Sequence, residues 1–289
     1  MKRVLTLGIG VLALAGSTFT AAAADLGAQP IGKAPVLAPP IYNWSGFYVG
    51  VGLGGRWTES DWQTTCLAPT VLGTATCPND VFAGTTRINN DNPGLFDSTG
   101  FRVSGYAGFN WQIQNWVLGV EGDFGWADNS ETRIGIPGTW SQTFGPGLDN
   151  ANITDKWDAS ARGRIGYLFA PTALLYVTGG AAWIEKEVTA TCAGTFPVGW
   201  CNQPGGATQS VSDTFFGWTV GGGFEWMILP GWIFRGEYRF TDYGSQTYTF
   251  FANTGIPAGA DSLTFDVEQK THTAYVGLSY LFNWAGPRP

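Results

Sequence analysis

Eight stretches of the chain alternate apolar and polar side chains with a period of two residues. In the last of them, Ala274, Val276, Leu278, Tyr280 and Phe282 share one parity, and the residues between them are smaller or more polar on average. Successive side chains of a strand point to opposite faces, so each stretch predicts an amphipathic strand. The predicted strands are 46–57, 100–112, 115–127, 157–169, 173–185, 214–226, 231–242 and 271–282.

The lengths of the strands and of their connections indicate where the sheet lies. Each strand has about ten to thirteen residues, close to the 9–11 that a tilted transmembrane strand needs and longer than is usual in soluble sheets. The connections alternate between short ones (113–114, 170–172 and 227–230) and long ones (58–99, 128–156, 186–213 and 243–270). This alternation predicts an all-β, eight-stranded antiparallel transmembrane barrel with short periplasmic turns and four long extracellular loops. The alternative is a soluble antiparallel sheet, which can show the same polar and apolar alternation.

The two parities differ in chemistry. The apolar parity carries aromatic residues toward the strand ends, as the interfacial girdles of a membrane barrel require. The other parity carries six arginines and five carboxylates, which we expect to pair inside the barrel because an unpaired buried charge is very costly. The predicted lumen charge network consists of Arg56, Arg102, Glu121, Asp123, Asp158, Arg162, Arg164, Glu225, Arg235, Glu237 and Arg239. An eight-stranded barrel has room for little more than its own side chains, so we predict a polar plug.

The N-terminal segment predicts export. Lys2 and Arg3 precede a short apolar run and an Ala-x-Ala site, which is typical of a cleaved signal peptide over residues 1–24. The predicted organisation continues with a proline-rich periplasmic linker (25–43), the barrel (44–283) and a C-terminal tail (284–289). Cleavage changes the formal charge from −7 to −9, which argues against nucleic acid as a partner.

The four cysteines predict disulfide bonds. Four cysteines allow three connectivities, and pairing Cys66 with Cys77 and Cys192 with Cys201 closes two short loops in an oxidising compartment. The chain has one histidine and no Cys-x-x-Cys, so we expect no metal site and no cofactor.

Three segments resemble the opacity-type outer-membrane barrels, in particular the small surface antigens of alpha-proteobacteria. The segments are 42–50 (Tyr-Asn-Trp-Ser-Gly-Phe-Tyr-Val-Gly), 119–123 (Gly-Val-Glu-Gly-Asp) and 275–282 (Tyr-Val-Gly-Leu-Ser-Tyr-Leu-Phe). The resemblance implies a bacterial outer-membrane location, insertion by the barrel-assembly machinery, a role in envelope integrity and contact with lipopolysaccharide. Some such proteins are adhesins or bind small ligands. These barrels commonly finish on the last aromatic residue, whereas residues 283–289 follow Phe282 here.

Function is therefore expected to lie in the envelope and at the loops. We predict a non-enzymatic structural barrel whose cations at or near the outer rim, Arg133, Lys156, Lys186 and Lys270, contact lipopolysaccharide phosphates. Host or surface ligands of the loops are further expected partners. The first alternative is a narrow porin or small-ligand channel, in which the arginines and carboxylates line a conducting lumen. The second is a lipid-modifying enzyme, which would need the lone His272 beside a serine and a carboxylate.

Overall fold

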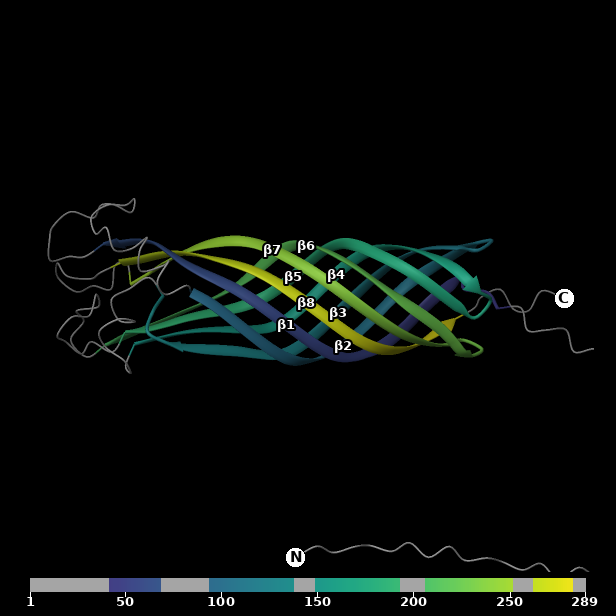
Figure 1. Cartoon of the computed structure of the whole chain (residues 1–289), viewed down its shortest axis with the longest axis horizontal. Coiled ribbons are helices and arrows are strands. Elements are labelled where there is room, and N and C mark those ends of the chain that lie inside the picture. Colours follow the sequence, from purple (N-terminus) through teal and green to yellow (C-terminus); the bar gives the residue numbers. More distant parts are fainter. Residues whose placement is uncertain (1–41, 69–93, 138–148, 193–205, 252–261, 283–289) are drawn as a thin grey trace, which may run out of the picture. The chain divides into compact units, whose positions relative to one another are not determined.

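The computed structural model describes residues 42–68, 94–137, 149–192, 206–251 and 262–282. Within them, eight antiparallel strands follow one another around a closed barrel, and β8 pairs with β1 so that Phe282 lies opposite Phe47 (Figure 1). The strands are β1 (Gly46–Ala68), β2 (Gly94–Ile113), β3 (Trp116–Ile134), β4 (Asn150–Ala170), β5 (Ala173–Cys192), β6 (Ala207–Leu229), β7 (Trp232–Phe250) and β8 (Ser262–Phe282). The predicted all-β, eight-stranded antiparallel barrel is confirmed.

The turns at one end of the barrel are short. Residues 114–115, 171–172 and 230–231 each join two strands. Gln114 and Gly231 have φ angles of 55° and 81°, the left-handed region that such tight turns use. The longer connections at the opposite end lie mostly outside the described residues, as do residues 1–41 and 283–289, which contain the predicted signal peptide, most of the linker and the tail.

The strands are longer than predicted, with 19 to 23 residues each. Much of the predicted long loops 58–99, 128–156, 186–213 and 243–270 is strand, so those boundaries were wrong. The reason is a reversal of the pattern. In β8, Leu263, Phe265 and Val267 are fully buried inside the barrel, and the polar Thr264 and Asp266 occupy the alternate positions. Each predicted strand consists of the part with apolar residues on the outer face. It ends where the apolar residues change to the inner face.

Two bulges contribute to this reversal. In β4 the register shifts between Asp155 and Asp158, and both residues point into the barrel although they are three positions apart. In β7 the register shifts between Asp242 and Ser245, around Gly244 with a φ of 67°. A bulge places two residues of one strand opposite one of its partner, so it changes which parity faces inward.

The outer surface divides into two zones. Large apolar side chains are exposed between two aromatic belts, and this zone is the membrane-spanning part. The outer girdle consists of Trp57, Trp126, Trp157, Trp183, Phe216 and Trp218, and the periplasmic girdle of Trp111, Trp116, Tyr167, Trp226, Trp232 and Tyr280. The strand segments beyond the outer girdle form the outer extension. No helix among the described residues is long and apolar enough to cross a membrane.

Candidate functional site

The barrel interior contains three layers, from the turn end to the outer extension. The first is the periplasmic plug, an apolar and aromatic cluster of Trp44, Tyr48, Tyr106, Val117, Leu168, Leu174, Met227, Ile233, Tyr275 and Leu281. The second is the charge network. The third is the outer core, an apolar cluster inside the extension that includes Trp62, Phe96, Ile153, Ile184, Phe215, Phe250, Leu263 and Phe265.

Trp44 fixes the periplasmic plug in place. Its side chain is fully buried, and its Nε1–H donates to the carbonyl of Pro171 at 3.1 Å, in the turn between β4 and β5. Its backbone N–H donates to Oε1 of Gln112 at 2.8 Å, near the end of β2. The chain therefore folds under the barrel before β1 begins, and one residue connects the β4–β5 turn to the end of β2. Trp44 belongs to a segment that the sequence flagged by resemblance, but its buried position was not predicted.

The outer half of the charge network is built around Asp123 and Asp158. Arg102 binds both carboxylates, with distances from Nη2 of 2.6 Å to Asp123 and 2.5 Å to Asp158. Arg239 contacts Asp123 at 2.7 Å, and Arg56 contacts Asp158 at 2.9 Å. All five side chains are buried, so each charge has exchanged water for an opposite charge within hydrogen-bonding distance.

The periplasmic half is built around Glu121. Its Oε1 contacts Arg162 and its Oε2 contacts Arg235, both at 2.6 Å, and Oε2 also lies 3.5 Å from Arg164. The hydroxyl of Tyr48 donates to the same carboxylate at 2.7 Å.

Two further carboxylates complete this half. Glu225 contacts Arg164 at 2.8 Å and Arg235 at 2.6 Å, and Glu237 contacts Arg162 at 2.5 Å. Tyrosine rings pack on the guanidinium groups, with Arg164 4.2 Å from the ring centre of Tyr176. The structure thus brings all eleven sequence-predicted network residues together inside the barrel, each in at least one ion pair.

Two further charged residues, both outside the predicted network, lie inside the barrel. Asp155 falls within the predicted loop 128–156, but it is buried in β4, lies 3.6 Å from Arg56 and accepts a hydrogen bond from Thr58 at 3.0 Å. The prediction that Lys186 contacts lipopolysaccharide is wrong, because its side chain is fully buried. Its ammonium group donates to Ser60 Oγ at 3.0 Å and lies 4.0 Å from Asp155.

The environment of Lys186 perturbs its protonation. The residue follows Trp183 of the outer girdle by three positions and lies in the outer extension, against the ring of Phe215. Burial lowers the pKa of Lys186 to about 8, with Asp155 opposing that shift and Arg56 adding to it. Parity could have revealed this position, since Lys186 continues the inward-facing series of Gly180 and Ile184.

The other predicted rim cations occupy different faces. Lys156 and Lys270 are exposed on the outside, where they pair with Glu187 at 2.9 Å and Glu268 at 2.7 Å. Arg133 lies opposite the buried Ala151, and its guanidinium is 5.4 Å from the ring centre of Phe96 in the outer core. Arg133 therefore points toward the outer core and not toward the surrounding lipid.

His272 lies on the outer surface at the outer girdle. Its Nδ1 shares a hydrogen bond of 2.6 Å with the Tyr238 hydroxyl, and its ring packs against Phe240. Over the described part of the chain, no three His, Cys, Asp or Glu side chains are arranged to hold a metal ion. Both disulfides remain predictions, since Cys77 and Cys201 lie outside the described residues; Cys192 is buried at the end of β5.

A closed antiparallel barrel that exposes apolar side chains between two aromatic girdles and encloses paired charges is an integral outer-membrane β-barrel protein. This chain belongs to the family described as outer membrane protein beta-barrel domain, whose model matches residues 10–282. It is a small outer-membrane barrel of the alpha-proteobacterial type, which confirms the predicted resemblance and outer-membrane location.

Proteins similar to this chain are also named as outer-membrane proteins. The chain is 26% identical over 268 residues to the 25 kDa outer-membrane immunogenic protein of Brucella melitensis, covering 92% of this chain and 97% of that protein. It is 32% identical over 149 residues to a 22 kDa outer membrane protein of Rhizobium leguminosarum, covering 52% of this chain and 56% of that one. Among solved structures, OprG of Pseudomonas aeruginosa matches 82% of this chain and 97% of its own at 9% identity, with a TM-score of 0.43.

Proposed function

We propose that this protein is a non-conducting, non-enzymatic barrel that contributes to envelope integrity, presents its loops at the cell surface and contacts lipopolysaccharide. The layered interior carries the proposal. The periplasmic plug and the outer core occupy the two ends of the lumen with apolar side chains, and the charge network fills the middle. The surface presentation is supported by the naming of the Brucella relatives as immunogenic proteins.

The state of the charges argues against a narrow porin. In a conducting lumen the arginines and carboxylates would be in contact with water, as in the polar, water-filled interior of larger barrels. Here the side chains of Arg235 and Glu237 have no exposed surface, and both form ion pairs. Opening such a network would separate buried charges, which is strongly unfavourable.

Conductance across planar bilayers tests this proposal. We expect the purified, folded protein to give no steady channels. Trp44→Ala serves as the comparison, because it removes the side chain that fills the periplasmic end and leaves the charge network in place. Steady channels in the unaltered protein, with an ion preference that changes in Arg235→Gln or Glu237→Gln, would contradict the proposal and favour the porin.

Contact with lipopolysaccharide is proposed for the outer face of the extension. Lys156 and Lys270 are exposed there, and each lies beside a carboxylate that a divalent cation could bridge to a phosphate. Each lysine near an anionic lipid surface contributes on the order of 1 kcal/mol.

We expect Lys156→Gln combined with Lys270→Gln to weaken binding to immobilised lipopolysaccharide roughly 30-fold at low salt. Lys186→Met is the matched control, since it removes a lysine charge that the barrel buries. Unchanged binding by the double variant would remove the basis for this part of the proposal.

The enzyme alternative has its own test. The Nδ1 atom of His272 forms a hydrogen bond with the hydroxyl of Tyr238. In a hydrolase, one ring nitrogen would bond to a serine and the other to a carboxylate. We expect no acyl transfer or hydrolysis by the protein in detergent. Either activity, if it were lost in His272→Ala, would favour the enzyme.

A further inference from the structure

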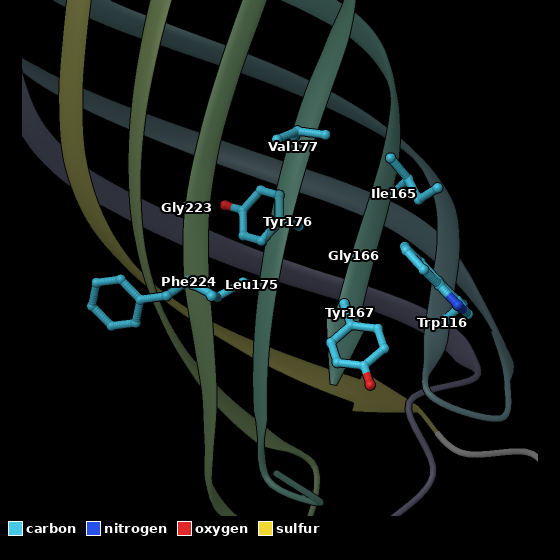
Figure 2. A pocket seen from close by; sticks show the side chains of 9 residues that line it. All are labelled: Trp116, Ile165, Gly166, Tyr167, Leu175, Tyr176, Val177, Gly223 and Phe224. Carbon is cyan, nitrogen blue, oxygen red and sulfur yellow. The ribbon is translucent and has the colours of Figure 1, made fainter. Parts of the chain in front are cut away.

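An apolar groove of about 560 Å³ opens on the outer surface of the membrane-spanning part. It is lined by residues of β3, β4, β5 and β6, close to the end where β4 meets its short turn (Figure 2). The backbone of Gly166, Tyr176 and Gly223, whose side-chain positions face the barrel interior, contributes to its lining, and Leu175 and Val177 line it from β5. The groove therefore lies in the periplasmic half of the apolar zone.

The two ends of the groove differ in chemistry. Trp116 and Tyr167 lie at the end nearer the periplasm, and Val177 lies at the other end (Figure 2). The rings of Trp116 and Tyr167 pack edge to face, with centres 5.2 Å apart, and both side chains are about half exposed. Each carries one polar group, an indole N–H or a phenol O–H, at the depth where aromatic belts meet lipid headgroups. The groove is thus apolar along its length and has hydrogen-bond donors at its periplasmic end.

This order of chemical groups matches one kind of molecule. A phospholipid of the periplasmic leaflet has phosphate and ester oxygens at the membrane surface and acyl chains that extend inward. An acyl chain that lies in a groove touches protein on several sides, and each contact adds a small dispersion attraction. We propose that the groove binds one phospholipid of the periplasmic leaflet, with an acyl chain along Leu175 and Val177 and its ester or phosphate oxygens at Trp116 and Tyr167.

Filling the groove tests the proposal. Val177→Trp places a large apolar side chain in it, at a position that is already exposed to lipid. Val51→Trp is the matched control, because Val51 on β1 is equally exposed, 62% against 59%, and lies outside the groove. Both variants keep the outer surface apolar. A boiling-dependent shift in gel mobility shows that each variant is folded before it is compared.

The measurement is native mass spectrometry of the barrel extracted from vesicles of phosphatidylethanolamine. We expect one retained phosphatidylethanolamine per barrel in the unaltered protein and in Val51→Trp, and about fivefold or greater loss in Val177→Trp. Tyr167→Phe removes only a hydroxyl group, and we expect it to reduce retention roughly 2- to 10-fold, as for one hydrogen bond.

Three results would overturn the inference. The first is the absence of retained phosphatidylethanolamine on the unaltered protein, and the second is equal retention in Val177→Trp. The third is a mass of two barrels that Val177→Trp alone abolishes, since it would assign the groove to a second copy of this chain. None of these results depends on whether the lumen conducts.

Discussion

Glu121 lies where several interactions of the barrel interior meet. It contacts Arg162, Arg164 and Arg235 and accepts a hydrogen bond from Tyr48. Removing its charge leaves three buried guanidinium groups short of a partner. We expect Glu121→Gln to lower the free energy of unfolding by about 3–5 kcal/mol, the typical cost of breaking a buried ion pair. Urea unfolding in detergent, followed by gel mobility, measures this change.

The control for Glu121→Gln is Glu268→Gln. Glu268 pairs with Lys270 at 2.7 Å, a similar distance, but both side chains are more than 40% exposed. Exposed pairs contribute about 0–1 kcal/mol, so this variant should unfold at nearly the same urea concentration as the unaltered protein. Equal effects of the two substitutions would show that burial does not determine the strength of the network.

Lys186 predicts a pH dependence of stability. Its pKa is lowered to about 8 in the folded protein, from about 10.4 in the unfolded chain. The unfolded state therefore binds more protons between these values, and stability contributed by this group rises as pH increases from about 8 to about 10.4. We expect Lys186→Met to be more stable than the unaltered protein below pH 8, and this difference to shrink toward pH 10.

Unfolding of both proteins at several pH values checks this prediction. A difference that does not vary over the window would mean that the lysine remains charged throughout. The substitution leaves Asp155 with Arg56, Thr58 and Gln269 as partners, so its carboxylate stays paired in the variant.

The eleven network residues could be predicted because their parity is uniform within the membrane-spanning part. Asp155 could not, since the bulge at residues 156–157 gives it the parity that faces outward in the membrane-spanning part of β4. Lys186 has the inward parity and could have been predicted if the strand had been extended by one residue. Trp44 precedes the first strand, so no alternation could indicate where its side chain lies.

At the scale of elements, several strands, β5 and β8 among them, combine two opposite amphipathic patterns. Inside the membrane the apolar side chains face out, and in the extension they face in. Phe265 illustrates the second pattern, because it is fully buried and stacks on Trp62 with ring centres 3.7 Å apart. The ends of the strands could not be predicted from outward apolar residues, since beyond the outer girdle the surrounding medium changes from lipid to water.

Phe265→Ser tests whether the outer core holds the extension together. Loss of a buried phenylalanine ring costs about 3–5 kcal/mol. We expect protease added from outside to cut the extension faster in this variant, while the membrane-spanning part stays intact. Asp266→Ser changes the next residue on the outer face and should leave the cleavage rate near that of the unaltered protein. Equal protection of both variants would contradict the proposed role of the core.

At the scale of the whole molecule, stability depends on the seam between β1 and β8. A closed barrel has no unpaired edge, and such barrels resist denaturation by detergent until boiled. Gly54 lies at this seam, and a Cβ atom there would come within 2.1 Å of the carbonyl oxygen of Ala274. We therefore expect Gly54→Val to abolish the boiling-dependent mobility shift.

Gly105→Val is the control for the seam. A Cβ atom at Gly105 on β2 meets nothing within 4 Å, so this variant should keep the shift. The same outcome for both glycines would mean that the added side chain, and not the closure of the barrel, determines the mobility. The closure itself could be predicted from the even number of strands, because pairing of the first with the last removes both edges.

The bulge in β4 also determines how this chain tolerates insertions and deletions. Residues 156 and 157 are consecutive positions that both lie on the outside of the barrel, next to the buried Asp155 and Asp158. Loss of one residue there would rotate the outer part of β4 by half a turn, so that Ile153 faced water and Asn152 and Thr154 entered the core. Deletion of one residue at this site thus exchanges the inward and outward faces of the outer part of β4. Within a connecting loop, the same deletion would only shorten the chain.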